Sequence, residues 1–401
     1  MNEPNFVNQT IWTGDNLPIT RGMNSESIDL IYLDPPFNSN TNYAAPIGSQ
    51  AAGAEFKDTW TLQDVDIAWL DLIEVKYPQL NKVIHAALNS SDKSYLIYIA
   101  VRLLEMHRLL KTTGSIYLHC DPTMSHWLKL LLDSIFEKRN FRNEIIWHYY
   151  NGTSNIKGGF CRKHDVILFY AKSLTDFKFN ENDTREPYHP ESNFVRNPKS
   201  YKDKYKPHPL GKRMHDVWRI PTINNMARER VGYPTQKPLS LLERIIKASS
   251  NKDDIVFDPF CGCATTLIAA DSLQRQWVGI DISPTAVRLV RERLKDGSTE
   301  GEHKDQWRNV IARNDIPERT DIGVILPYNH KDNKRSLFAL QEGVCNGCSE
   351  HYQFKDFHVD HIIDRKSGGT DHLNNLQLLC GHCNSVKGDR GMEYLIAKLA
   401  A

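Results

Sequence analysis

The stretch IDLIYLDPPF, residues 28–37, decides the fold of this chain. Its first six residues are largely apolar, a pattern typical of a strand that is buried on both faces of a sheet. The two prolines stop the strand abruptly at its carboxyl end. Because ligands of open α/β sheets bind beyond the carboxyl ends of the strands, we expect the side chain of Asp34 to face a pocket.

Asp34, the carbonyl of Pro35 and the ring of Phe37 together suit one chemistry. The exocyclic amino nitrogen of adenine or cytosine is a poor nucleophile, because its lone pair is delocalised into the ring. A carboxylate and a carbonyl that each accept one N–H would draw that nitrogen toward a tetrahedral, attacking form. An aromatic ring would stack on a base flipped from the duplex. Taken alone, the residues also fit a plain strand-ending turn with a capping Asp and a core Phe.

The composition is that of a soluble protein of two or three domains. No apolar run approaches the length of a membrane span, and the amino-terminal residues do not resemble a signal peptide. We therefore expect no membrane association and a cytoplasmic location, of the prokaryotic or phage type. The net charge of +1 is close to neutral, so any DNA-binding charge must be gathered locally.

Helical and strand patterns alternate through most of the chain. Residues 11–33 begin with a turn signal at Trp12–Asn16 and continue into the strand that precedes Asp34. Such alternation predicts an α/β fold with a doubly wound sheet. The further strands are expected near 115–120, 144–149, 165–170, 255–258 and 277–281, and the helices near 95–111, 124–138, 239–246 and 264–273.

Two segments interrupt the alternation. Residues 38–60 are rich in Asn, Ala, Gly and Ser and are predicted to form a long mobile loop, a lid that orders on DNA. Residues 171–232 contain the basic run Arg196–Arg213, in which Tyr201, Tyr205 and His208 are interleaved. Such a run is often only a solvated face. Here we favour a segment that contacts DNA phosphates and recognises the target sequence.

A second strand–turn–helix–strand unit begins at Ile255. Asp258 ends its first strand, Gly262 lies in the turn, and Asp281 ends its second strand, 23 positions after Asp258. This layout matches a dinucleotide-type βαβ unit, whose second acid binds ribose hydroxyls. The phosphate-binding G-x-G-x-x-G pattern is absent from it. The unit therefore favours an adenosyl cofactor without a pyrophosphate.

These motifs resemble those of the amino-group DNA methyltransferases that use S-adenosylmethionine, which have a Rossmann-like fold. Residues 34–37 look like the catalytic motif, and residues 258–262 look like the loop that cradles the methionine part of the cofactor. The order of the motifs is that of the β class, and the resemblance spans about residues 11–295. It implies cofactor-binding roles for Asp258, Phe260, Gly262, Asp281, Thr235 and Lys237.

The target base and one departure from the family also follow from the resemblance. An Asp in the first catalytic position leans toward adenine N6, whereas Ser leans toward cytosine N4. No Pro-Cys dipeptide occurs, which disfavours methylation of a cytosine ring carbon. The family's cofactor loop usually reads Gly-Ser-Gly, but this chain has Gly262-Cys263-Ala264. We expect the cofactor to bind to this loop nevertheless.

The carboxyl-terminal part contains two Cys-x-x-Cys pairs. Cys345 and Cys348 precede Cys380 and Cys383, an arrangement typical of tetrahedral zinc coordination. We expect this structural zinc to hold together a small module, residues 336–401, behind a linker at residues 296–335. The remaining cysteines, Cys120, Cys161, Cys261 and Cys263, are interpreted as packing residues.

Residues 343–391 also resemble the His-Asn-His (HNH) nucleases, in the variant whose last His is Asn. The resemblance implies a ββα-metal fold in which His361 is the general base and Asn375 braces the hairpin that carries it. Asp360 and Asn384 would hold Mg²⁺ or Mn²⁺, which prefers oxygen ligands. A zinc finger that only binds DNA, with His361 as a bystander, is a simpler alternative, but we favour a nuclease because all four positions of the pattern are filled.

Three functions remain open on the sequence. The first is a restriction–modification-like enzyme that methylates double-stranded DNA and also cuts it. The second is a methyltransferase whose zinc module only docks on DNA. The third is a sensor that binds cofactor and site without turnover. Members of the resembled class are often dimers, so a homodimer is a weak expectation.

Overall fold

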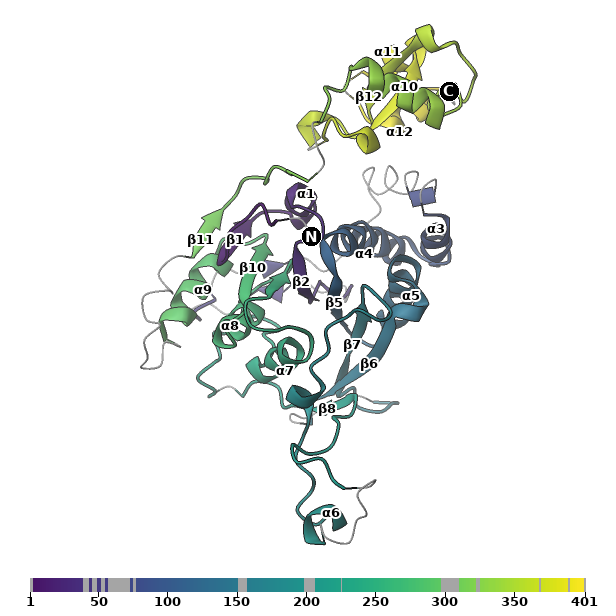
Figure 1. Cartoon of the computed structure of the whole chain (residues 1–401). Coiled ribbons are helices and arrows are strands. Elements are labelled where there is room, and N and C mark those ends of the chain that lie inside the picture. Colours follow the sequence, from purple (N-terminus) through teal and green to yellow (C-terminus); the bar gives the residue numbers. More distant parts are fainter. Residues whose placement is uncertain are drawn as a thin grey trace. The chain divides into compact units, whose positions relative to one another are not determined.

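The chain divides into two compact units, residues 1–60 with 83–319 and residues 61–82 with 320–401. The computed structural model in Figure 1 describes residues 3–38, 43–44, 49–51, 55–56, 73–74, 77–150, 157–197, 206–224, 226–296, 310–321, 325–367, 369–388 and 390–399. No described helix is long and apolar enough to span a membrane.

The described part of the first unit contains one nine-stranded sheet in the order β11-β1-β10-β9-β2-β5-β7-β6-β8. The strands from β11 to β5 pair in parallel, whereas β7 pairs antiparallel with both β5 and β6. The strands are β1 (Thr10–Thr13), β2 (Ile28–Leu33), β5 (Leu110–Cys120), β6 (Phe141–His148), β7 (His164–Ala171), β8 (Val217–Arg219), β9 (Ile255–Asp258), β10 (Gln276–Asp281) and β11 (Ile311–Arg313), with the separate pair β3 (Tyr43–Ala44) and β4 (Glu55–Phe56).

Helices connect these strands and cover the sheet, as Figure 1 shows. Two of them begin at a side chain that caps the helix: Asp15 accepts a hydrogen bond from the N–H of Leu17 at the start of α1, and Asn89 accepts one from that of Asp92 at the start of α4. The helices of this unit are α1 (Asn16–Gly22), α4 (Ser90–Leu109), α5 (Ser125–Phe136), α6 (Asn193–Arg196), α7 (Leu239–Ser249), α8 (Thr265–Ser272) and α9 (Thr285–Asp296), and α3 (Pro78–His85) begins in residues 61–82 of the second unit and ends in the first.

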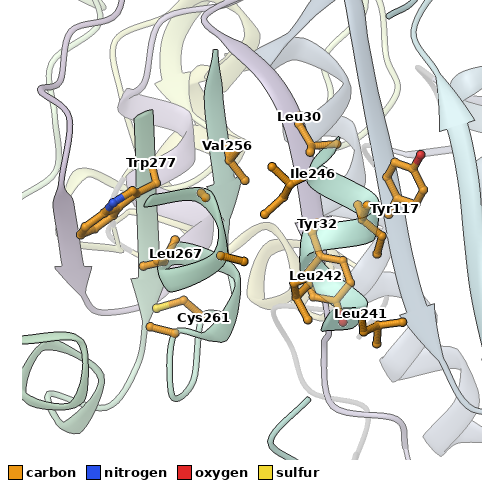
Figure 2. Close-up of a cluster of buried hydrophobic side chains, with 14 of the residues drawn as sticks. Leu30, Tyr32, Tyr117, Leu241, Leu242, Ile246, Val256, Cys261, Leu267 and Trp277 are labelled. Carbon is orange, nitrogen blue, oxygen red and sulfur yellow. The ribbon is translucent and has the colours of Figure 1, made fainter. Parts of the chain in front are cut away.

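Strand β2 lies in the middle of the sheet with all six residues buried. Leu30 and Tyr32 pack with the apolar face of α7, which contributes Leu242 and Ile246, as Figure 2 shows. Because side chains alternate along a strand, Ile31 faces the opposite side of the sheet, where it is also fully buried. The doubly wound α/β fold expected from the sequence is therefore present.

The direction in which successive strands are added to the sheet reverses between β9 and β2. Strand β2 is followed by its neighbour β5 on one side, whereas β9 is followed by β10 on the other. A crevice forms beyond the carboxyl ends of strands at such a switch point. Asp34 and Asp258 end the two strands there, and Asp281 ends the adjacent β10.

Two sequence predictions need correction in this unit. Residues 10–13, in part interpreted as a turn, form strand β1, which pairs with β10 and β11. This strand is too short for its apolar pattern to stand out. Residues 311–313, inside the predicted linker, form the edge strand β11. The sheet therefore extends beyond the predicted end of the domain at residue 295.

Most of the predicted lid and part of the basic run lie outside the described residues. Of residues 38–60, the segment 49–51 is packed into the unit: Ala51 is fully buried, and its N–H donates to the carbonyl of Val231. In the basic run, residues 198–205 are not described. Three described cations of the run are already paired with acids: Arg196 with Glu191, Lys212 with Glu186 and Arg213 with Glu181.

The described part of the second unit is small and has its own core. Strands β12 (Phe357–His361) and β13 (Leu376–Cys380) pair antiparallel, and α10 (Lys331–Leu340), α11 (Gly381–Lys387) and α12 (Met392–Leu399) pack around them. Leu378, Leu379 and Leu395 are fully buried in this core together with cysteines. Strand, strand and helix α11 give the ββα arrangement expected from the sequence.

Candidate active sites

A pocket of about 700 Å³ lies at the carboxyl edge of the central strands. Such a position is typical of ligand sites in doubly wound sheets. The predicted residues Asp34, Pro35, Phe37, Thr235, Lys237, Asp258, Phe260, Gly262 and Asp281 all line it. The fold thus brings together residues that are up to 247 positions apart in the chain.

Asp34 makes one ion pair in this pocket. Its Oδ2 lies 2.5 Å from Nζ of Lys237, and both side chains are largely buried. The other oxygen, Oδ1, is buried and has no hydrogen-bond partner among the residues that the structure describes. A buried acceptor without a partner costs free energy, so such a group at a pocket wall points to a ligand that donates a hydrogen bond.

Phe37 lies close to a cation and to a buried imidazole. The ammonium of Lys237 is 5.3 Å from the centroid of its ring, and the ring of His119 stacks against it. Both ring nitrogens of the buried His119 have partners: its Nδ1 lies 2.9 Å from Oη of Tyr32, and its Nε2 lies 3.1 Å from Oδ2 of Asp165. Burial acts to raise the pKa of Asp165, but the hydrogen bond with His119 lowers it below its ordinary value.

The other wall of the pocket carries two carboxyl groups. Asp281 accepts hydrogen bonds from the N–H groups of Gly262 and Ser283, yet burial raises its pKa. Burial also raises the pKa of Asp258 to about 7, against hydrogen bonds from Thr266 and from the N–H of Phe260. Asp281 ties the glycine loop to the end of β10, which places the loop beside an acid that suits ribose hydroxyls.

Two residues of the glycine loop, Gly262 and Ala264, have the left-handed backbone conformation that glycine adopts most readily. Gly262 has φ +50°, and a Cβ there would lie 3.2 Å from the ring of Tyr233. Ala264, where the family usually has its second glycine, has φ +61° and ψ 32°. A left-handed residue with a Cβ is strained by about 1–2 kcal/mol. The loop therefore keeps its shape in this chain despite the alanine.

A polar cluster of Asp15, Asn16 and Arg102, which was not predicted from the sequence, lines the same pocket. Arg102 donates from Nε to Asn16 and pairs with Asp15, and its guanidinium lies 3.4 Å from the ring centroid of Tyr98. Asn16 in turn donates to the carbonyl of Pro259, which joins this cluster to the cofactor loop. The sequence gives no signal for this cluster, because Asp15 follows β1, which is too short for its apolar pattern to stand out.

The four carboxyl-terminal cysteines converge. The sulfur atoms of Cys345, Cys348, Cys380 and Cys383 lie within 4.8 Å of one another. A tetrahedral zinc with bonds of about 2.3 Å would separate its sulfur ligands by about 3.8 Å. Backbone N–H groups of Gly347 and Cys383 also point at the sulfurs of the preceding cysteines, as befits thiolate ligands. The donor set fits zinc.

The packing interpretation holds for three of the other four cysteines. Cys120, Cys261 and Cys263 are buried, and the latter two line the pocket. Cys161 is exposed, so its interpretation as a packing residue is wrong. It lies in the loop before β7, where it has no core to join.

His361 ends β12 and is held by an acid that the sequence did not reveal. Its Nε2 lies 2.8 Å from Oδ1 of Asp371, and its ring lies against that of Tyr328. Burial acts to raise the pKa of Asp371, but hydrogen bonds from Arg365 and His361 lower it below its ordinary value. An acid on Nε2 orients the imidazole and leaves Nδ1 for a water molecule.

Asn375 and Asp360 lie on either side of this histidine. The side chain of Asn375 donates to the carbonyls of Ile363 and Thr370 and accepts from the N–H of Ile363, which are the contacts of a brace. Asp360 uses Oδ2 for Nζ of Lys387, at 3.0 Å, and for Gln377.

One of the two oxygens of Asp360 is therefore already engaged, and the other remains as a donor for a divalent cation, together with Asn384. In the described part of the unit, no contact engages Oδ1 of Asp360 or the side chain of Asn384. These oxygen donors match the ligand type that Mg²⁺ prefers. An ammonium already neutralises the carboxylate, however, so the pair offers less attraction to a cation than a free acid would.

Family models match both parts of the chain. Residues 28–292 match the DNA methylase family of N6 and N4 methyltransferases, and residues 345–390 match the HNH endonuclease family.

Curated relatives share the methylase part. Type II methyltransferase M.HpaI of Haemophilus parainfluenzae is 27% identical over 72% of this chain and 74% of its own length. DNA adenine methyltransferase YhdJ of Escherichia coli is 28% identical over 71% of this chain and 82% of its own. The solved structure of the M1.HpyAVI–SAM complex aligns with a TM-score of 0.42 and 19% identity, covering 71% of this chain and 98% of that one.

Proposed function

This chain belongs to the family of amino-group DNA methylases and carries an HNH endonuclease domain, and from that premise we propose that it moves a methyl group from S-adenosylmethionine to adenine N6 in double-stranded DNA. The observation that supports the proposal most strongly is Oδ1 of Asp34, which is buried in the wall of the pocket and has no hydrogen-bond partner in the part of the chain that the structure describes.

The proposed transfer assigns a task to each residue. Bound in the pocket, S-adenosylmethionine supplies an electrophilic methyl group on its sulfonium. Asp281 would hold the ribose, and the loop of Asp258, Phe260 and Gly262 would hold the methionine part. Oδ1 of Asp34 would accept one N–H of the target amino group, and the carbonyl of Pro35 the other. Phe37 would stack on the flipped base.

Adenine is favoured over cytosine by Asp34 itself and by the relative named an adenine methyltransferase. The test is to label genomic DNA with methyl-labelled cofactor in the presence of a chelator and to separate the nucleosides. Label in N6-methyladenine supports the proposal. Label in N4-methylcytosine keeps the mechanism but contradicts the choice of base.

We assign DNA cleavage to the module of residues 336–401. Zinc held by the four cysteines would fix the fold, and a divalent cation at Asp360 and Asn384 would neutralise charge on the phosphate. His361, oriented by Asp371, would take a proton from the attacking water through Nδ1. Cutting of unmethylated plasmid that needs Mg²⁺ or Mn²⁺ supports this assignment.

The second candidate function is a zinc module that only docks on DNA. The Lys387–Asp360 ion pair favours it, because the ammonium occupies one oxygen of the expected metal ligand. Under this alternative no divalent cation gives cutting, and deletion of residues 336–401 weakens DNA binding. The two outcomes separate a bifunctional enzyme from a methyltransferase with a binding arm.

A further inference from the structure

We propose that Lys237 is a positioning residue for methyl transfer, which acts on Asp34 and not on the cofactor. Its ammonium would occupy Oδ2 of Asp34 so that Oδ1 alone faces the target amino group. The inference rests on the proposed function and deepens it, because it explains how a carboxylate with two equivalent oxygens presents one of them.

The described contacts of the ammonium all lie on the catalytic side of the pocket. Nζ of Lys237 lies 2.5 Å from Oδ2 of Asp34 and 3.2 Å from the carbonyl of Thr235, and it faces the ring of Phe37. Thr235 has φ +61°, a left-handed conformation that threonine rarely adopts. None of these partners belongs to the loop of residues 258–262 or to Asp281.

The ion pair between Lys237 and Asp34 is costly to break because both side chains are largely buried. The side chain of Lys237 is 8% exposed and that of Asp34 is 17% exposed. A charge removed from water needs a partner of opposite sign, and such a pair is costly to break. The ion pair therefore fixes the rotation of the Asp34 carboxylate.

The consequence for the reaction is geometric. Oδ1 is buried and has no partner within the described ranges, so it is the acceptor available to an N–H of the base. The nitrogen lone pair then forms the N–C bond while the electron pair of the C–S bond goes to sulfur. The surplus proton leaves the nitrogen through Oδ1 of Asp34 to water. A carboxylate free to rotate would spend less time in this geometry.

The test measures cofactor affinity and transfer rate separately in the full-length protein. We expect Lys237→Met to lower the single-turnover rate at saturating DNA and cofactor by about 100-fold, the size typical of a lost positioned group. The Kd for S-adenosylmethionine should change by less than about threefold. Lys237→Arg keeps the charge and should recover much of the rate. The control is Lys247→Met, at a half-exposed lysine of α7 paired with Glu243, which should leave both quantities unchanged.

A double-mutant cycle shows whether Lys237 acts through Asp34. In the Asp34→Asn background, Lys237→Met should cost no further rate, because the carboxylate that it orients is gone. This double variant also lacks the unpaired buried charge, so it folds even where Lys237→Met alone is destabilised.

Three results would overturn the inference. A tenfold higher Kd for S-adenosylmethionine with an unchanged rate at saturation would show that Lys237 is a cofactor ligand. A faster transfer rate in Lys237→Met would show that Lys237 blocks the position of the target base and must be displaced by it. A loss of rate that is additive with Asp34→Asn would make it independent of Asp34. Absence of transfer by the wild-type protein contradicts the proposed function itself, and the inference falls with it.

Discussion

The imidazole of His119 stacks on the ring of Phe37, with centroids 5.8 Å apart and an angle of 26° between the planes. His119 is fully buried and is fixed by Tyr32 and Asp165, so one face of Phe37 is permanently covered. The proposed flipped base can then stack only on the remaining part of the ring. A rigid, one-sided platform positions a base better than a mobile ring does.

We therefore expect His119→Ala to slow methyl transfer by about tenfold, mainly through a higher KM for DNA, because Phe37 loses its support. Cofactor affinity should stay unchanged. Steady-state kinetics with varied DNA and varied cofactor separate the two effects. His126→Ala, at an exposed histidine at the start of α5, is the matched control. An equal loss in both variants would contradict the role of His119.

Asp258 predicts a specific pH dependence of stability. Its pKa is raised by burial to about 7 in the folded protein, above its ordinary value. Between those values the folded state binds a proton that the unfolded state lacks, so stability falls as the pH rises toward 7. Between pH 6 and pH 8 this contributes a loss of about 1.4 kcal/mol in the free energy of unfolding.

The measurement is denaturant unfolding of the cofactor-free protein at both pH values. The Asp258→Asn variant cannot titrate at this position and should lose that part of the difference. Other groups, such as Asp271 with a pKa raised by burial to about 6, titrate in both proteins and cancel in the comparison. Identical pH dependence of the two proteins would contradict the assignment.

Removal of zinc should affect the two units differently. The buried core of the second unit contains three of the four cysteines, so loss of the metal should unfold that module. We expect a strong chelator or Cys345→Ser to abolish hydrogen-exchange protection of β12 and β13. Methyl transfer should continue. Cys161→Ser, at an exposed cysteine outside the cluster, should change neither. Retained protection after complete zinc removal would argue against a structural metal.

Cleavage should depend on Asp371 as well as on His361. We expect His361→Ala to abolish cutting and Asp371→Asn to slow it by about 10- to 100-fold, because the imidazole loses its orienting acid. His358→Ala, at an exposed histidine on the same strand, is the control. Initial rates on supercoiled plasmid with Mg²⁺ provide the comparison. Full activity of Asp371→Asn would show that the pair is only structural.

The sequence predicted the centre of the fold because its strands there are buried on both faces. Strand β2 was located to the residue, and β9 and β10 to within one residue, since apolar runs ending in Asp are unambiguous. Short elements at the edge were not recognised: β1 and β11 have three or four residues and are defined by pairing across the sheet. Pairing between strands that are distant in the chain leaves little pattern in the local sequence.

The residues of the two sites also divide into those that sequence motifs predict and those that only the tertiary structure reveals. Motif residues such as Asp34 and Asp281 could be located because each ends a strand. Their partners could not, because tertiary structure decides them. Lys237 was assigned to the cofactor, yet its ammonium lies on Asp34, 203 positions away. Asp371 and Lys387 lie within residues 343–391, but the resemblance implies no role for either, and only the folded module shows that they contact His361 and Asp360.

The central claim is that Oδ1 of Asp34 accepts a hydrogen bond from an amino group of DNA during methyl transfer. Its most direct test compares wild-type protein with Asp34→Asn on unmethylated genomic DNA and methyl-labelled cofactor, after the cofactor Kd of both has been measured. The account predicts equal cofactor affinity, label in N6-methyladenine for the wild type, and a rate at least about 1,000-fold lower for the variant. Comparable label from both proteins would contradict it.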